Sequence, residues 1–326
     1  MKAIGLNGKR VFITGANGGL GFETVKQLAK LHLESLTLAA RTSQKADSTR
    51  NDLRTEVKTS VRVDAVGGFD MNDPDAIQRA VAAMGKREPF DVIFLQVGGV
   101  FFGPDYQYIN HKGMTIEKTI FQNTIGSYLT LVELKKRGLV ADDARVVFAG
   151  GEGARGIPGM IEKPVFQTTD TFRNYVFGRA REKKYNPMNA IGVSKLASAL
   201  LVQRLSRFND GVTYLWFSPG LTHGTNGLAK AAPIRRFVME NIAFGISGLL
   251  GFSQSPRAGA AKYIEALTGK VGKNGDVLGA PEGKVLGKIT DQLPMNPSLT
   301  DEALIEEFWT ILQKVSPMEH SEFVLS

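Results

Sequence analysis

The sequence contains no cysteine in its 326 residues. This absence excludes disulfides, catalytic thiolates and metal sites with thiolate ligands. Long apolar runs are also missing: the most apolar stretch, residues 244–252, is far shorter than the roughly 20 residues that a membrane-spanning helix needs. We therefore expect no membrane span. Because the first strand-like run begins near Lys9, we expect no signal or transit peptide and a cytoplasmic location.

Runs of like charge are absent as well. Lysine and arginine number 40 against 32 aspartates and glutamates, which gives a formal net charge of +8, but the two signs are interspersed. A scattered basic surplus is typical of a solvated surface and not of a nucleic-acid-binding tract. We predict neither a nucleic-acid partner nor a metal site. The composition, 43% hydrophobic and 22% charged, is that of an ordinary globular protein.

Short apolar runs alternate along the chain with segments of helical periodicity. The runs that predict strands are residues 11–13, 36–40, 61–69, 91–97, 145–149 and 212–217. This alternation predicts the α/β class: a doubly wound, Rossmann-type parallel sheet covered by helices on both faces, with ligands at the carboxyl ends of the strands. No repeat or linker divides residues 1–326, so we expect a single domain. Two insertions, about 152–186 and 221–254, are expected to form the substrate side.

A glycine-rich run at residues 14–21, TGANGGLG, follows the first strand and opens the first helix. Glycines there allow a sharp turn, a close approach of backbone N–H groups to a pyrophosphate, and tight packing of the helix on the sheet. The helix N-terminus then faces the anion. The alternative is a glycine-rich turn without a ligand. Predicted cofactor-binding residues in this run are Thr14, Gly15, Asn17, Gly19, Leu20 and Gly21.

The end of the second strand bears on which dinucleotide binds. NAD-binding proteins usually place a carboxylate there for the ribose 2′-hydroxyl, whereas an arginine accommodates a 2′-phosphate. This sequence has Ala40 followed by Arg41. We therefore predict NADP(H) as the cofactor, the alternative being that Arg41 is a solvated surface cation.

These residues resemble the short-chain dehydrogenase/reductase family, whose TGxxxGxG motif matches the glycine-rich run. The resemblance implies that Asp70 contacts the adenine and that Pro219 and Gly220 line the nicotinamide. Residues 96–99, Gln-Val-Gly-Gly, stand where the family has Asn-Asn-Ala-Gly, and Gly98 is expected at the cofactor. The nearest branch is that of retinol-dehydrogenase-like and protochlorophyllide-reductase-like proteins, through residues 184–186, Lys-Tyr-Asn, and 194–197, Ser-Lys-Leu-Ala.

The resemblance also implies a homo-oligomer, because family members often associate through two helices. In this sequence the matching segments are residues 110–137 and 187–207.

The catalytic half of the family pattern is incomplete. The usual tetrad is Asn, Ser, Tyr and Lys, in which Tyr exchanges the proton with the substrate oxygen. Asn123 and Lys195 match two members. The Tyr position, one helical turn before the lysine, is Ile191, and the Ser position is about Gly151, so neither can serve as a proton donor.

Four other side chains are candidates for the missing acid. The resemblance places Tyr185 just before the helix that carries the lysine, and His223 just after the Pro-Gly turn. Tyr175 and Glu152 belong to the predicted substrate side. Their alternatives are a packing tyrosine, a structural histidine, and a salt bridge between Glu152 and Arg155. Lys195 in turn can hold the cofactor ribose and do no chemistry.

The insertions suggest an apolar or ring-containing substrate. Residues 237–252 can cap such a pocket, and these side chains can wall it: Met160, Val165, Phe166, Phe172, Tyr175 and Phe177. The alternative is that the aromatics pack the insertion onto the core.

Three functions remain open at this point. The first is an atypical NADP(H)-dependent oxidoreductase whose substrate, a C=C bond, an imine or a carbonyl, needs no tyrosine acid. The second is a non-redox cyclase, isomerase or lyase on the same scaffold. The third is a non-catalytic NADP(H)-binding sensor or interaction protein.

Overall fold

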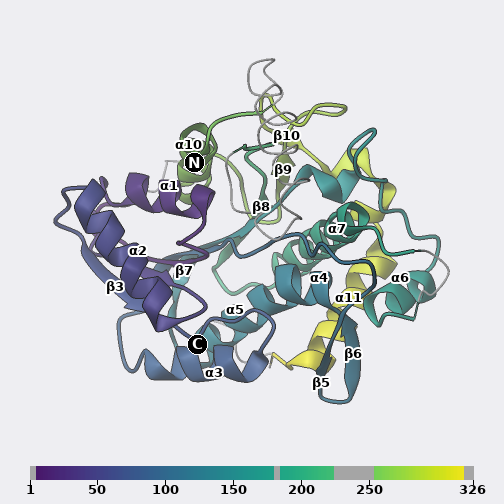
Figure 1. The fold of residues 1–326 in the computed structure, drawn as a ribbon, viewed down its shortest axis with the longest axis horizontal. Coiled ribbons are helices and arrows are strands. Elements are labelled where there is room, and N and C mark those ends of the chain that lie inside the picture. Colours follow the sequence, from purple (N-terminus) through teal and green to yellow (C-terminus); the bar gives the residue numbers. More distant parts are fainter. Residues whose placement is uncertain (1–4, 180–183, 224–252, 319–326) are drawn as a thin grey trace.

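An eight-stranded sheet forms the centre of the molecule (Figure 1). The computed structural model describes residues 5–179, 184–223 and 253–318. The strand order is β10-β9-β8-β7-β4-β1-β2-β3, parallel throughout except for β10. The strands are β1 (Arg10–Thr14), β2 (Ser35–Ala39), β3 (Arg62–Val66), β4 (Phe90–Leu95), β7 (Val140–Ala149), β8 (Thr213–Phe217), β9 (Val277–Gly279) and β10 (Thr290–Asp291). The predicted doubly wound parallel sheet is confirmed, and β9 and β10 extend it at one edge.

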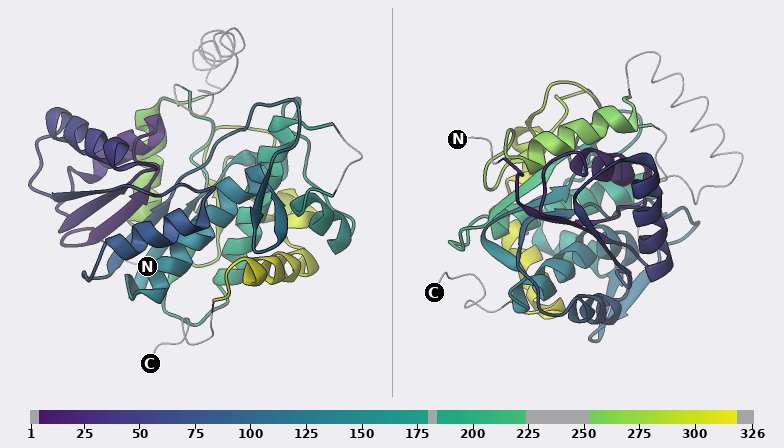
Figure 2. Two further views of the ribbon diagram at one scale, coloured as in Figure 1. Left: turned by 60° about the horizontal axis from the view of Figure 1, so that its bottom comes forward. Right: turned by 90° about the vertical axis from the view of Figure 1, so that its left-hand side faces the viewer.

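The pleat of β1 shows why helices cover both faces. Val11 and Ile13 belong to one hydrophobic cluster, and Phe12 between them belongs to the other. The first cluster includes residues of α1 (Gly19–Leu28), α2 (Ser43–Glu56) and α10 (Pro256–Leu267). The second includes residues of α3 (Pro74–Ala83), α5 (Gly126–Lys136) and α7 (Pro187–Leu205). Figure 2 shows these two layers of helices on either side of the strands.

A C-terminal helix, α11 (Glu302–Val315), adds a further layer over α7 and α6 (Thr169–Val176). Its buried side is apolar and comprises Leu304, Ile305, Phe308, Ile311, Leu312 and Val315. The hydroxyl of Tyr128 in α5 donates to the carbonyl of Ser316 at 2.8 Å. The C-terminal helix of the chain therefore packs on α7 and contacts Tyr128 of α5, two of the segments through which we expected a second copy to bind. None of the helices in the described residues is long and apolar enough to cross a membrane.

The prediction of a helix over residues 110–137 is wrong for the first eight of these residues. The structure has an antiparallel hairpin, β5 (Tyr108–His111) and β6 (Met114–Glu117), and the helical segment begins at α4 (Lys118–Ile120). The turn residues Lys112 and Gly113 have φ of 47° and 74°, the backbone of a tight two-residue hairpin loop. Glu117 then caps the helix by accepting from the amide of Ile120 at 2.8 Å. The second predicted segment, 187–207, is a helix that ends at Leu205.

Candidate active site at the carboxyl ends of the strands

The glycine-rich run forms a tight turn between β1 and α1, where the strand order reverses from β1 towards β4. The Thr14 hydroxyl accepts from the amide of Gln96 at 3.0 Å, which ties the ends of β1 and β4 together. Gly15 has φ +72°, and a Cβ at Gly21 would lie 2.2 Å from the Gly15 carbonyl oxygen. Only glycine fits at Gly21 without moving the turn. The first amides of α1, a ten-residue helix, are thereby directed at the crevice where dinucleotides bind in such sheets.

The predicted specificity residues lie at the next strand ends. Arg41 follows buried Ala40, and its Nε lies 3.6 Å from a carboxylate oxygen of Asp70. Both side chains keep partial exposure, 43% and 35%, so the guanidinium is held in place without being enclosed. The other oxygen of Asp70 accepts from the amide of Asn72 at 3.1 Å. The structure thus places Arg41 and Asp70 together, while their roles at the 2′-phosphate and the adenine stay predictions.

Lys195 of α7 reaches across to the end of β7. Its Nζ donates to the carbonyl of Ala149 at 2.7 Å. Two glycines flank the side chain: a Cβ at Gly98 would lie 3.6 Å from Nζ, and one at Gly151 would lie 3.4 Å from Cε. Removal from water lowers the pKa of Lys195 to about 8, against a smaller opposing effect of the Glu152 carboxylate. The ammonium is therefore set between the ends of β4 and β7, in the same crevice as the glycine turn.

Asn123 clamps the loop that follows β4. It lies in η1 (Phe121–Ile125), a single π-helical turn between α4 and α5. Its Oδ1 accepts from the Gly99 amide at 2.7 Å, and its Nδ2 donates to the carbonyls of Gly99 at 3.0 Å and Thr119 at 2.8 Å. Both amide hydrogens are thereby used. These contacts give Asn123 a structural task, and the water-holding role implied by the resemblance stays a prediction.

Tyr185 holds the same loop from the other side. Its hydroxyl donates to the carbonyl of Phe101 at 2.9 Å and lies 3.4 Å from the Thr119 hydroxyl. The ring packs edge-on against Tyr106, and burial raises the pKa of Tyr185 to about 12. Tyr175, which contacts the same Tyr106 ring, has its pKa raised further by burial. Neither tyrosine is poised to release a proton near neutral pH.

We expect the Tyr185→Phe variant to keep the pH dependence of any turnover, because the lost hydroxyl holds a loop and does not exchange protons with substrate. The variant loses one hydrogen bond, about 1 kcal/mol, so an effect of a few-fold on substrate KM is expected. Steady-state rates between pH 6 and 10 test this, with the exposed Tyr108→Phe as the matched control. Loss of one limb of the pH profile in Tyr185→Phe alone would identify Tyr185 as the acid after all.

Glu152 belongs to η2 (Glu152–Arg155), the short helix directly after the Ser position. Its carboxylate is buried, and Oε1 accepts from the Ala280 amide at 3.1 Å. The alternative of a salt bridge with Arg155 is not realised among the described residues. The guanidinium of Arg155 donates instead to the Gln292 side chain at 2.8 Å and to the carbonyls of Gly156, Ala280, Pro281 and Lys284. Both residues therefore fasten the segment after β9 to the end of β7.

The Pro-Gly turn after β8 is fixed by a residue that the sequence did not point to. Lys262 of α10 donates to the carbonyl of Pro219 at 3.0 Å, and Gly220 has φ +92°. Burial lowers the pKa of Lys262. His223 is partly buried, and its Nδ1 lies 3.1 Å from the Ser253 hydroxyl. No motif marks Lys262, because only the folding of α10 against α1 brings it to this turn.

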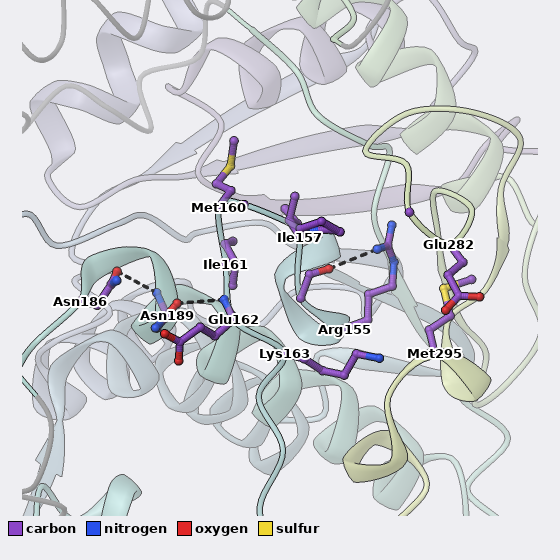
Figure 3. Close-up of a pocket in the computed structure, with 14 residues that line it drawn as sticks. Arg155, Ile157, Met160, Ile161, Glu162, Lys163, Asn186, Asn189, Glu282 and Met295 are labelled. Carbon is purple, nitrogen blue, oxygen red and sulfur yellow. Dashed lines mark hydrogen bonds between the residues drawn. The ribbon is translucent and has the colours of Figure 1, made fainter.

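A cavity of about 610 Å³ lies beside η2 and the first turn of α7 (Figure 3). Asn186 and Asn189 line it. Lys195 comes nine residues after Asn186, which is about two and a half turns, so it lies on the opposite side of α7. This cavity is therefore separate from the Lys195 crevice.

The aromatic side chains of the insertion mostly pack inward. Of the six predicted pocket-wall side chains, only Met160 lines the cavity. Phe166 and Phe172 stack edge to face with centroids 5.1 Å apart, and Phe172 contacts Phe308 of α11 at 5.8 Å. The aromatics thus attach the insertion to the core, the second of our two alternatives. The predicted cap, residues 237–252, lies outside the described residues.

Comparison with known proteins completes the description of the site. A family model described as "short chain dehydrogenase" matches residues 9–156. A short chain dehydrogenase/reductase of Annulohypoxylon moriforme is 25% identical over 273 residues, 81% of this chain and 73% of that protein. Retinol dehydrogenase 12 of Homo sapiens is 28% identical over 218 residues, 66% of this chain and 62% of that protein. The crystal structure of an uncharacterized protein from Mycobacterium Paratuberculosis has the same fold, with a TM-score of 0.64 at 20% identity, covering 99% of this chain and 98% of the other.

Proposed function

We propose that this chain is an NADP(H)-dependent oxidoreductase of the short-chain dehydrogenase/reductase family that works without a tyrosine acid at position 191. The family-model match and the curated relatives support the proposal. The observation that carries the proposal is the crevice itself. The glycine turn at residues 14–21, Arg41 and Lys195 stand at the carboxyl ends of β1, β2 and β7, where a bound dinucleotide would meet all three.

The residues present fit a nicotinamide dinucleotide. The turn is so tight at Gly21 that no Cβ is tolerated, which keeps the backbone of the turn and the first amides of α1 close together. The α1 amides would hold the pyrophosphate, Arg41 the 2′-phosphate, and Asp70 the adenine. When bound, the nicotinamide supplies or accepts the hydride.

The substrate side is less polar than the family pattern. Gly151 has no side chain where a serine would polarise a carbonyl, and Ile191 presents an aliphatic group where a tyrosine would donate. We propose that the substrate is a small molecule with an apolar or ring-containing body around its reducible carbonyl, imine or C=C bond. Ile191 supports this class because it offers hydrophobic contact at the reaction centre.

We expect Arg41→Ala to lower NADPH affinity by about 10- to 100-fold, because a charge-assisted contact to phosphate is worth about 1.5–3 kcal/mol. NADH affinity should change by less than about two-fold, since no 2′-phosphate is present. Fluorescence titration of both nucleotides measures the two constants. Arg54→Ala, near the far end of α2, is the matched control. Equal losses for NADPH and NADH would exclude Arg41 as a phosphate ligand.

Hydride transfer itself is tested with NADPH carrying deuterium at C4 and a panel of aldehydes, ketones, imines and enones. Deuterium in the product supports the oxidoreductase proposal. Conversion without deuterium in any product, and without net loss of NADPH, would establish a non-redox enzyme. Tight NADPH binding without any conversion would establish a binding protein.

A further inference from the structure

The proton that accompanies hydride transfer has no evident source at position 191. A group that supplies it must lie in the crevice and hold a transferable hydrogen near neutral pH. That hydrogen must not already be donated to another protein group. The Tyr185 hydroxyl is committed to the Phe101 carbonyl, and the buried Glu152 carboxylate accepts from the Ala280 amide. His223 is already paired through Nδ1 with the Ser253 hydroxyl, at 3.1 Å.

The two lysines at the site differ in how their hydrogens are used. Lys262 donates to the carbonyls of Pro219 and Gly287, at 3.0 and 3.4 Å, on the α10 side of the turn. The Lys195 ammonium has three hydrogens, and the Ala149 carbonyl accepts one of them. No other acceptor for Lys195 lies among the residues that the structure describes. Two hydrogens are therefore left for ligands in the crevice.

The Lys195 ammonium is withdrawn from water, and its neighbours at the ends of β4 and β7 are glycines. Gly98, after β4, and Gly151, after β7, flank it, and neither has a side chain that would screen it. An ordinary side chain at Gly98 would also collide with Oδ1 of Asn123, 2.6 Å from the Cβ position. Glycine at position 98 thus lets the Asn123 clamp and the Lys195 ammonium lie side by side.

We propose that Lys195 is itself the proton donor for the substrate oxygen. This inference rests on the proposed function. A bound reduced nicotinamide would supply the hydride for the new C–H bond. As the carbonyl π pair moves to oxygen, one Lys195 N–H bond breaks and an O–H bond forms to that oxygen. Lys195 is left as a neutral amine, which water reprotonates.

The electrostatics of the crevice suit this role. Desolvation lowers the pKa of Lys195 to about 8, close to neutral pH, where an acid both holds and releases its proton effectively. Glu152 of η2 opposes the shift, and the other charged groups on neighbouring elements are Arg155 of η2, Lys118 of α4 and Lys262 of α10. Lys195 is charged below about pH 8 and neutral above it, so reduction should fall as the pH rises through about 8.

The decisive variant is Lys195→Arg. Arginine keeps the positive charge and a donor towards the Ala149 carbonyl, but it does not release its proton. Hydride transfer in a single turnover should fall by about 10²- to 10⁴-fold, the usual contribution of general acid catalysis. The rate that remains should no longer fall as the pH rises through about 8, so the alkaline limb of the pH profile should be lost. NADPH affinity should stay within about three-fold of the original, because the charge remains.

A second variant tests the proposal without changing Lys195, so its result does not depend on how the larger arginine packs in Lys195→Arg. Glu152→Gln removes the charge that raises the pKa of Lys195, so the alkaline limb should move to lower pH, while Glu152→Asp should move it less. Glu88→Gln, on an exposed residue, is the control and should leave it in place. The Lys195 amine is also titrated directly by NMR in protein with ¹³C-labelled lysine and no cofactor, where we expect a pKa near the value given above.

Failure of this inference and failure of the proposed function give different results. If the unaltered protein transfers deuterium but Lys195→Arg keeps both its rate and its alkaline limb, another group donates the proton and the oxidoreductase proposal stands. A Lys195 amine that titrates like a free lysine also overturns the inference. If the unaltered protein transfers no deuterium to any substrate, both proposals fall together.

Discussion

Replacing Gly21 by alanine is expected to lower NADP(H) affinity at least about 100-fold, a loss of about 2.7 kcal/mol or more. The added Cβ would lie 2.2 Å from the Gly15 carbonyl oxygen and 2.9 Å from Oε1 of Gln96. Neither neighbour is a flexible chain end at the surface, because the first is backbone of the turn and the second is a buried atom. The turn has to open, and the amides of α1 then no longer converge on the pyrophosphate.

Gly18→Ala is the matched control for Gly21→Ala. A Cβ at Gly18 would meet its nearest neighbour, the same Gly15 oxygen, at an ordinary 3.5 Å. Gly18 also has φ −85°, which alanine adopts without strain. Calorimetric titration with NADPH and NADH, on variants whose circular dichroism shows an intact fold, compares the two. Similar affinities for both variants would show that the turn does not hold the cofactor.

Replacing Arg145 by methionine should reduce the free energy of unfolding by about 3–5 kcal/mol, because it removes the charge-assisted hydrogen bonds from a buried guanidinium to three carbonyls. Arg145 lies on β7 and is 4% exposed. Its guanidinium donates to the carbonyls of Ala266, Val271 and Gly272, at 2.6, 2.8 and 2.9 Å. These carbonyls belong to the last turn of α10 and the chain beyond it, so Arg145 supplies the hydrogen bonds that a helix end lacks.

Burial lowers the pKa of Arg145 to about 10, and the side chain stays charged at neutral pH. Methionine carries no charge, so the folded variant no longer bears the cost of desolvating the guanidinium. This gain offsets part of the loss in the free energy of unfolding. Urea unfolding curves measure it. Arg207→Met, which removes an exposed pair with Glu302, should cost less than about 1 kcal/mol. A loss below that of the control would mean that water replaces the guanidinium at the carbonyls.

The strands and the glycine turn after β1 were predictable because their signals are local. An apolar run such as that of β4 identifies a buried parallel strand, and the glycines at residues 14–21 restrict the backbone wherever they occur. The hairpin of β5 and β6 was predictable in principle. Its residues alternate about a Lys112-Gly113 turn, but the family resemblance implied a helix over residues 110–137, and that expectation was given precedence.

The catalytic half could not be assigned in this way. Whether Tyr185 is free or bonded depends on the Phe101 carbonyl, 84 residues away along the chain. The sequence likewise offered an ion pair between Glu152 and Arg155, but the fold gives each of them other partners across the end of the sheet. Such partners are chosen by packing between distant segments, and no spacing rule encodes them.

The sequence by itself determined the class of fold, the glycine turn, the arginine after β2, and the isoleucine and glycine at positions 191 and 151. Each follows from residue type and short-range order, because strand periodicity, positive φ and a missing hydroxyl are properties of a few neighbouring residues. The tertiary structure alone decided which polar groups are already satisfied, that Lys262 supports the Pro-Gly turn, and that the Lys195 ammonium faces the crevice between two glycines. Desolvation and hydrogen-bond partners depend on every segment that packs around an atom, and these set the chemistry available at the site.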